Sequence, residues 1–271
     1  MSISVIVSAY KDAHSLDKVL AAYSVQTLIP DEIIIAEDGE SQDIIQLVNR
    51  WKPLLKSTLL HVSQKDDGFR KNRILNKAIN ISTSDQLIFT DQDIIVRDDF
   101  VAMHASLIKP GYFITGGSHL DLSSNFHRKL LNTVDIINQK IFSLDFLRKN
   151  THIEFSTLRL TTKRFLAIFL DFITPRNRFI GCNSSAYRED VLKVCGFDES
   201  FNHYGEEDNN LGIRLNNLGI KGVRKKYSLV CLHLDHVRAY QDREKNNEAK
   251  ELNSRVRKNR LIKPEGSLFL K

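Results

Sequence analysis

Short apolar runs typical of β-strands alternate with amphipathic segments along the first third of the chain. The apolar runs lie at residues 4–7, 32–37, 58–62 and 86–90. Between them, apolar side chains recur at helical spacing, as at Leu16, Val19 and Tyr23, and this pattern predicts helices over residues 16–23, 44–51 and 70–81. Strands that alternate with helices are typical of βαβ units on a largely parallel sheet. We therefore expect four βα repeats before the acidic triplet at residues 91–93.

The second half of the chain has a less regular pattern. Residues 123–178 mix apolar and basic side chains without a strand pattern, and we expect them to be mostly helical. A helix is expected over residues 205–217, followed by short strands at 220–223 and 228–232. The tail over residues 238–263 is rich in Lys, Arg, Glu and Asn, which is typical of a solvated helix. The pattern thus predicts an α/β fold with a mainly parallel sheet flanked by helices, a helical insertion and a basic C-terminal helix.

The composition is that of an ordinary folded protein. Of 271 residues, 42% are hydrophobic and 27% are charged, which excludes a disordered, collagen-like or disulfide-dense chain. The three cysteines, Cys182, Cys195 and Cys231, are widely spaced and form no CxxC pair, so they indicate neither a disulfide framework nor a zinc ribbon. No apolar run approaches the ~20 residues of a membrane-spanning helix, and no signal-like flank follows Met1. We expect a cytoplasmic protein.

The net charge of +6 predicts an anionic partner. Nucleic acid, a phosphorylated small molecule and anionic lipid all meet that description. A non-catalytic nucleic-acid-binding protein is one alternative, but residues 243–263 of the basic tail contain no aromatic side chain, and the acidic clusters elsewhere would repel a phosphate backbone. We therefore expect no nucleic acid partner. The amphipathic stretches at residues 130–141 and 162–173 can pack on the core or on a membrane surface, and the core is the commoner outcome.

Small, aromatic or acidic side chains follow every predicted strand of the first half. In an open α/β sheet the ligand binds at the carboxyl ends of the strands. The residues in that position are Ser8, Ala9, Tyr10, Asp38, Gly39, Asp66, Asp67, Gly68, Asp91 and Asp93. Aspartate is also common in turns and helix caps, which would explain any one of these positions alone. Their recurrence at four strand ends favours a binding site.

The carboxylates of Asp91 and Asp93 lie two residues apart at a strand end, so both can converge on one hard dication. A DxD pair by itself occurs often by chance. Here a basic trio precedes it within residues 70–73, and a second acidic cluster lies at residues 206–208. Acidic residues that hold a metal, together with basic residues that hold phosphate, are what a nucleotide-diphosphate site requires. The basic trio can also be a solvated helix face, which is the commoner role of such residues.

Six motifs follow one another along most of the chain. They are SVIVSAY from Ser4, GFRKNRILNKAI from Gly68, LIFTDQD from Leu87, GCNSSAYRED from Gly181, GFDESFNHYGEEDNNLGIRL from Gly196 and CLHLDHV from Cys231. In this order they resemble the family 2 glycosyltransferases, which have the Rossmann-like GT-A fold that binds nucleotide sugars. Residues 196–215 also look like the carboxyl-terminal module of galactosyltransferases and polypeptide N-acetylgalactosaminyltransferases. This resemblance implies a UDP-sugar donor that carries a hexose or an N-acetylhexosamine.

The resemblance implies one GT-A domain over residues 1–237. Its nucleotide-binding half would cover residues 1–118, a mostly helical insertion 119–178, and the acceptor and metal half 179–237. Residues 238–271 would form a basic C-terminal tail.

Residues of the nucleotide-binding half are expected to contact the donor. The resemblance implies that Ala9 and Tyr10 line the nucleoside pocket. Asp38 would accept a hydrogen bond from the uracil ring, and either Arg70 or Arg73 would contact the base or the diphosphate.

The same resemblance implies a metal site for Mn²⁺ or Mg²⁺. Asp91 would face the ribose or the donor sugar, and Asp93 would bind the metal. A histidine of the CLHLDHV motif would complete the site, and His236 is a better match than His233. An HxxH pair can also lie on an irregular surface segment, and imidazole is a softer ligand than these metals need.

Glu207 and Asp208 match the ED pair of the family, in which the aspartate commonly serves as the catalytic base. Asp208 would take the proton of the acceptor hydroxyl, a contribution of about 10²–10⁴-fold, and a single displacement would invert the anomeric centre. The resemblance implies transfer to a saccharide or glycolipid acceptor in surface polysaccharide or lipopolysaccharide synthesis. The basic tail and residues 123–178 suggest peripheral contact with an anionic membrane on the acceptor side. A nucleotidyltransferase acting on sugar phosphates is the closer alternative, but residues 8–15 lack its usual glycine-rich loop.

Overall fold

The fold is built on a mixed, mainly parallel sheet. The computed structural model describes residues 1–117, 120–121, 132–143, 145–146, 164–171, 178–234 and 243–264. Within this part of the chain the sheet has seven strands: β1 (Ile3–Ala9), β2 (Glu32–Glu37), β3 (Thr58–Ser63), β4 (Gln86–Asp91), β6 (Tyr112–Gly116), β8 (Ser184–Tyr187) and β9 (Lys221–Lys225). They lie in the order β3-β2-β1-β4-β8-β6-β9, and β8 runs antiparallel to both of its neighbours. The predicted α/β class with a mainly parallel sheet is confirmed.

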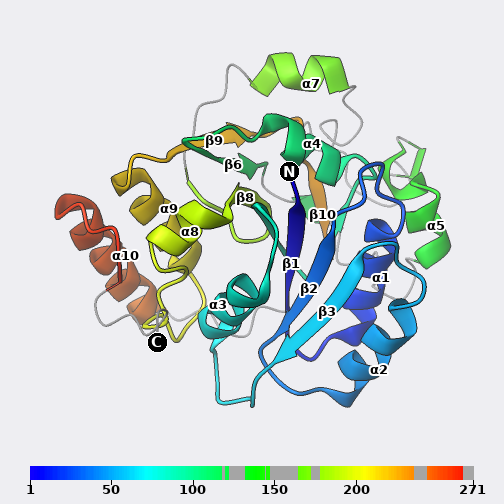
Figure 1. The fold of residues 1–271 in the computed structure, drawn as a ribbon, viewed down its shortest axis with the longest axis horizontal. Helices are drawn as coiled ribbons and strands as arrows, with labels where there is room; N and C mark the ends of the chain where they lie inside the picture. Colours follow the sequence, from blue (N-terminus) through cyan, green and yellow to red (C-terminus); the bar gives the residue numbers. More distant parts are fainter. Residues whose placement is uncertain are drawn as a thin grey trace.

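Both faces of the sheet are covered by helices, as Figure 1 shows. Helices α1 (Ala13–Tyr23) and α2 (Gln42–Trp51) cover one face, and α3 (Lys71–Ile81), α8 (Arg188–Lys193) and α9 (Glu207–Asn217) cover the other. Successive side chains of a strand point to opposite faces, so Val5 and Val7 join one hydrophobic core and Ile6 joins the other. This arrangement explains why the strands read as continuous apolar runs instead of alternating ones.

A second, smaller sheet closes one end of the molecule. It contains β5 (Ile94–Val96), β10 (Cys231–His233) and β7 (Leu120–Asp121), with β10 in the middle. The prediction of a fourth βα repeat is wrong, because β4 leads into β5 and only then into helix α4 (Phe100–Leu107). Antiparallel pairing with β10 holds β5 in this place, and the N–H of Leu234 donates to the carbonyl of Asp93 at 2.8 Å.

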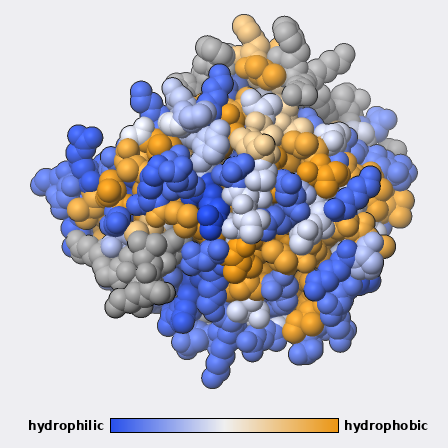
Figure 2. All heavy atoms as spheres, in the orientation of Figure 1, coloured by the Kyte–Doolittle hydropathy of each residue, from blue (hydrophilic) through white to orange (hydrophobic). Residues whose placement is uncertain are grey.

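The remaining described elements lie around this framework. They are α5 (Thr133–Ile137), a 3₁₀ helix (Lys140–Phe142), α7 (Arg164–Asp171) and α10 (Arg243–Lys258). Helix α10 lies beside α9 at the left of Figure 1, and hydrophilic side chains cover much of it in Figure 2. Much of the predicted helical insertion at 119–178 lies outside the described residues. Among the described helices, none has both the length and the apolar character needed to cross a membrane.

A cluster of aromatic rings supports the segment that precedes β8. Phe179 is fully buried, with its ring centroid 5.8 Å from that of Phe89 and 5.6 Å from that of Phe113. On its other side lies Gly212 of α9, where an added Cβ would come within 2.7 Å of the Phe179 Cβ. The segment after Phe179 is therefore held tightly between the sheet and α9.

We expect Phe179→Ala to lower the free energy of unfolding by about 3–5 kcal/mol, because it leaves a cavity among packed rings. The matched control is Phe169→Ala on α7, where the side chain is 68% exposed, and its cost should stay within about 0.5 kcal/mol. Urea unfolding monitored by circular dichroism measures both. Equal losses in the two variants would contradict the packing described for Phe179.

Candidate active site

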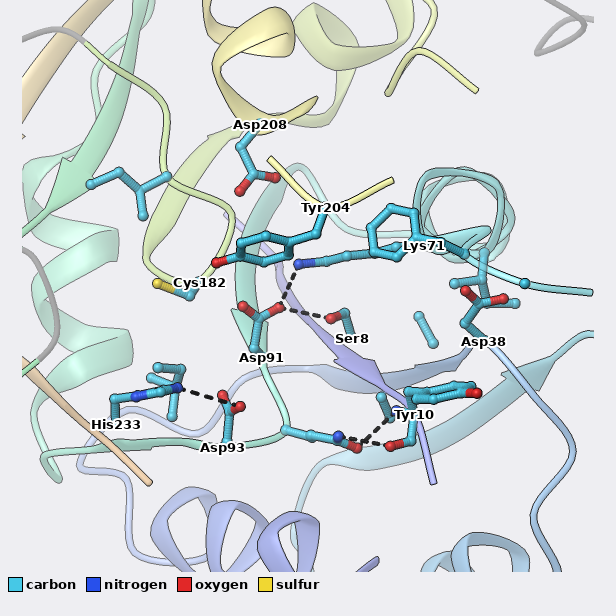
Figure 3. Close-up of a pocket in the computed structure, with 18 residues that line it drawn as sticks. Ser8, Tyr10, Asp38, Lys71, Asp91, Asp93, Cys182, Tyr204, Asp208 and His233 are labelled. Atoms are coloured by element: carbon cyan, nitrogen blue, oxygen red, sulfur yellow. Dashed lines mark hydrogen bonds and ion pairs between the residues drawn. The ribbon is translucent and has the colours of Figure 1, made fainter. Parts of the chain in front are cut away.

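A cavity of about 480 Å³ opens at the carboxyl ends of β1 and β4. This volume lies within the ~300–1,000 Å³ range of small-molecule sites. From β1 the chain continues to β2 toward one edge of the sheet, and from β4 it continues to β6 toward the other edge. Open α/β sheets bind ligands where the strand order reverses in this way. The parallel register sets Ser8 opposite Asp91, so both side chains meet at the cavity (Figure 3).

Most of the residues predicted from the sequence line this one cavity. They are Ala9, Tyr10, Asp38, Asp91, Asp93, Asp208 and His233. Glu207 lies next to Asp208 but lines a neighbouring cavity instead. The side chains of Arg70 and Arg73 are not among the residues that line the cavity, and His236 lies outside the described residues.

Lys71 is the basic side chain that lines the cavity, and the sequence analysis gave it no individual role. It extends from the start of α3, and its Nζ lies 2.9 Å from Oδ1 of Asp91, which also accepts a 2.7 Å hydrogen bond from Ser8 (Figure 3). Burial by itself would lower the pKa of Lys71, but the carboxylates of Asp91, Asp208 and Glu207 together raise it well above its ordinary value. The ammonium group therefore stays charged among these acids.

The helical phase of α3 explains why Lys71 and not its basic neighbours reaches the cavity. Positions 71, 74 and 78 fall on one face of a helix, and Ile74 and Ala78 are fully buried. Arg73 is exposed on another face. Arg70 precedes the helix, and its guanidinium lies 3.6 Å from the carboxylate of Asp67. One helical turn before the buried positions 74 and 78 lies position 71, so the spacing of the apolar residues identifies Lys71 from the sequence.

Two glutamines fix the residues expected to contact the nucleoside. Asp38 is buried and accepts a 2.8 Å hydrogen bond from Gln64 Nε2 and a 2.7 Å bond from the backbone N–H of Arg70. Gln92 accepts from the N–H of Tyr10 at 2.8 Å and donates to its carbonyl at 2.9 Å. The Gln92 side chain thus pairs with the backbone of Tyr10, just after the end of β1, as a neighbouring strand would. Gln64 lies in none of the six motifs, and Gln92 lies in LIFTDQD at a position to which the motif gives no role.

Asp93 and His233 form the part of the expected metal site that the structure describes. Pairing between β5 and β10 brings His233 Nε2 within 3.5 Å of Asp93 Oδ2. Within the described residues, no three His, Cys, Asp or Glu side chains are close enough together to hold a metal ion. A carboxylate oxygen suits Mn²⁺ or Mg²⁺, and such ions commonly complete their coordination with water and substrate phosphate. The pair therefore fits a divalent cation as a partial ligand set.

Asp208 points toward the cavity from the first turn of α9 (Figure 3). Its Oδ2 accepts a 2.9 Å hydrogen bond from the N–H of Gly181, and a Cβ at position 181 would overlap the carboxylate. The other oxygen, Oδ1, is buried and receives no hydrogen bond from the part of the chain that the structure describes. Burial raises the pKa of Asp208. This oxygen can accept a proton or a hydrogen bond from a ligand.

Glu207 is buried beside Asp208 and does not reach the first cavity. One of its oxygens accepts a 2.7 Å hydrogen bond from the N–H of Gly205. Burial, with a further contribution from the Asp208 charge, raises the pKa of Glu207 to about 7. Two neighbouring carboxylates in a dry environment do not ionise independently.

Comparison with protein families gives two matches that adjoin along the chain. Residues 4–169 match the family described as "Glycosyl transferase family 2". Residues 166–237 match the family described as "N-terminal domain of galactosyltransferase".

Curated relatives are about one quarter identical to this chain. Chondroitin synthase from Escherichia coli is 26% identical over 229 residues, which cover 79% of this chain and 32% of that protein. The "Uncharacterized glycosyltransferase YfnE" of Bacillus subtilis (strain 168) is 25% identical over 269 residues, covering 87% of this chain and 65% of that one. The chain thus spans about one third of the first relative and about two thirds of the second.

Solved structures share the fold at lower identity. S. aureus TarS 1–349 in complex with UDP-GlcNAc has a TM-score of 0.63 at 13% identity, covering 94% of this chain and 66% of that one. The mannosyltransferase PcManGT from Pyrobaculum calidifontis, in complex with GDP-Man and Mn²⁺, has a TM-score of 0.58 at 19% identity, covering 88% and 58%.

We expect Glu207→Gln to change how stability depends on pH. The folded-state pKa of about 7 exceeds the ordinary value of 4.5. Between these values the folded state holds more protons than the unfolded state, so stability falls as pH rises through this window. Glutamine does not titrate, so the variant should gain stability over the wild type between pH 5 and pH 8, by up to about 3 kcal/mol.

Melting temperatures from pH 5 to pH 8 measure this difference. Glu248→Gln, at an exposed position of α10, is the matched control and should follow the wild type. A Glu207→Gln protein whose melting temperature follows the wild type at every pH would contradict the raised pKa.

Proposed function

Since the chain belongs to glycosyl transferase family 2, we propose that it transfers a hexose or an N-acetylhexosamine from a UDP-sugar to a saccharide or glycolipid acceptor, with inversion. Family membership makes the chain a glycosyltransferase, in place of a nucleotidyltransferase or a non-catalytic protein. The absence of a nucleic acid partner stays a prediction. The observation that carries the proposal is the arrangement of Asp38, Asp93 and Asp208 around one cavity at the carboxyl end of the sheet.

The donor would lie along the cavity with its nucleoside next to Tyr10 and Asp38. Ala9 lines the same region, and the buried carboxylate of Asp38 can accept a hydrogen bond from the uracil ring. Solved structures that share the fold support a nucleotide-sugar donor, because one contains UDP-GlcNAc and another contains GDP-Man. Contacts from Arg70 or Arg73 to the donor stay predictions.

The diphosphate and the donor sugar would lie next to Asp91 and Lys71. The ammonium of Lys71 lies inside the cavity and remains charged there, so it can contact a phosphate oxygen. Asp91 is oriented by Ser8 and Lys71 together and can accept a hydrogen bond from a ribose or sugar hydroxyl.

Asp93 and His233, with His236, are the residues we propose to hold Mn²⁺ or Mg²⁺. A bound dication would stabilise the negative charge that develops on the departing diphosphate. The likeness to a mannosyltransferase solved in complex with Mn²⁺ supports the use of a divalent metal.

Asp208 is the proposed general base. Its Oδ1 has no hydrogen-bond donor within the described residues, so it can accept the proton of the acceptor hydroxyl. Gly181 holds the other oxygen and thereby the orientation of the carboxylate. Lys71 lowers the pKa of Asp208 and opposes the larger effect of burial. The raised pKa makes this carboxylate a stronger base than an ordinary aspartate.

The place of action is also part of the proposal. The three cysteines are free and buried, which suits a reducing cytoplasmic environment. Peripheral contact with an anionic membrane and a role in surface polysaccharide or lipopolysaccharide synthesis stay predictions.

We expect Asp208→Asn to lower turnover by about 10²–10⁴-fold, because asparagine cannot accept the proton. UDP affinity should stay within about threefold of the wild type, since the base contacts the acceptor and not the nucleotide. Turnover is measured with the UDP-sugar that a hydrolysis screen selects, and UDP affinity by calorimetry. Asp43→Asn on the exposed face of α2 is the control. Near-normal turnover in Asp208→Asn would rule out this base.

We expect Asp93→Ala to weaken UDP binding in manganese by about tenfold or more, equivalent to ~1.4 kcal/mol. The reason is that the carboxylate would bind the metal that contacts the diphosphate. Calorimetry in manganese and in EDTA should show that the variant has lost the difference between the two conditions, while Asp43→Ala keeps it. Unchanged affinity of Asp93→Ala in manganese would refute Asp93 as a metal ligand.

A further inference from the structure

A second cavity of about 540 Å³ adjoins the first on the side of α9 and α10. The two cavities share Ile180, Tyr204 and Asp208. The second one is also lined by Arg178, Phe179, Gly205, Glu206, Glu207, Arg224, Asn246 and Lys250. We propose that it binds the acceptor saccharide through an anionic group, a carboxylate or a phosphate, and that α10 supplies part of the recognition. This inference rests on the proposed function and adds the chemical class of the acceptor.

The shared position of Asp208 connects the second cavity to the reaction. Its carboxylate lines both cavities, with the donor expected in the first. A saccharide in the second cavity would present a hydroxyl to Asp208 from the side opposite the donor. Tyr204, which is 43% exposed, lines both spaces and can pack against a sugar ring.

Besides Asp208, the proposed base, the second cavity has two acidic residues, and both are engaged by the protein. Glu206 lies 3.0 Å from the guanidinium of Arg178 and accepts hydrogen bonds from Asn209 at 2.8 Å and Asn253 at 3.2 Å. Glu207 accepts from the backbone of Gly205, and the pKa of about 7 leaves it partly uncharged at neutral pH. These two acids therefore contribute little free negative charge to the cavity.

Basic side chains lie on the other walls. Arg224 comes from β9 and Lys250 from α10, so the two reach the cavity from separate parts of the chain. Lys250 is exposed, and within the described residues it forms no ion pair. An exposed ammonium and an arginine that line one cavity suit a carboxylate or phosphate better than a neutral sugar.

Helix α10 is fixed firmly enough to form a specific wall. Asn253 donates to the carbonyl of Glu206 at 3.0 Å and accepts from Asn210 at 2.9 Å, which ties α10 to the turn that carries the base. Gly205 has φ +113°, and a Cβ there would overlap the amide of Asn246. Helix α10 also follows residue 237, where the family matches end.

Saccharide binding measured by NMR titration tests the proposal. The probes are methyl β-glucuronide, glucose 6-phosphate and the neutral methyl β-glucoside, each titrated with and without UDP and Mg²⁺. We expect at least one anionic probe to bind about tenfold more tightly than the neutral one. Comparing the two anionic probes distinguishes a carboxylate from a phosphate.

Two variants of α10 distinguish anion recognition by the second cavity from a general effect of the protein's positive charge. Lys250→Gln should remove most of the anionic preference, whereas Lys258→Gln makes the same charge change at an exposed position outside the cavity and should keep it. Equal binding of all probes, no binding of any, or equal effects of the two variants would overturn the proposal. UDP affinity measured on the same samples tests the proposed function separately, because the saccharide titrations are also made without UDP.

Discussion

Repulsion between carboxylates is the constraint on which the site depends. Asp91, Asp93 and Asp208 open onto one cavity, and Glu207 is buried beside them. Burial raises the pKa of Glu207 and of Asp208, and the charge of a neighbouring carboxylate adds to the effect in both cases. Lys71 partly offsets this effect from within the cavity, and the raised pKa values of Glu207 and Asp208 show that repulsion and burial remain. A site with such excess negative charge is suited to bind a cation together with its ligand.

The positions of these charged side chains follow mainly from the pairing and hydrogen bonding of the backbone. The parallel register of β1 and β4 sets Ser8 opposite Asp91, and the pairing of β5 with β10 brings His233 to Asp93. Gly181 leaves room for the carboxylate of Asp208 and donates a hydrogen bond to it. Asp91 lies at the end of β4 and Asp208 in the first turn of α9, and Asp93 lies in the turn between β4 and β5.

Much of this arrangement could be predicted from the sequence, because hydrophobic periodicity locates strands and the carboxyl ends of parallel strands meet at one edge. The predicted strand at residues 32–37 has its observed bounds. Of the aspartates that follow the strands, Asp38, Asp91 and Asp93 line the cavity, whereas Asp66 and Asp67 do not. The GFRKNRILNKAI motif does not by itself single out Lys71 from Arg70 and Arg73, because only the direction in which each side chain points at the start of α3 distinguishes them. The small sheet around β10 and the cavity wall from α10 depend on contacts between distant segments, such as Asn210 with Asn253, which periodicity does not encode.

The most direct test of the account is the crystal structure of the protein with UDP and Mn²⁺, with the metal located by its anomalous scattering. The account predicts a manganese peak beside the carboxylate of Asp93 and the uracil ring beside Tyr10 and Asp38, with Asp208 left free to face an acceptor. Ordered UDP outside this cavity, or its uracil ring on the Asp208 side, would contradict it.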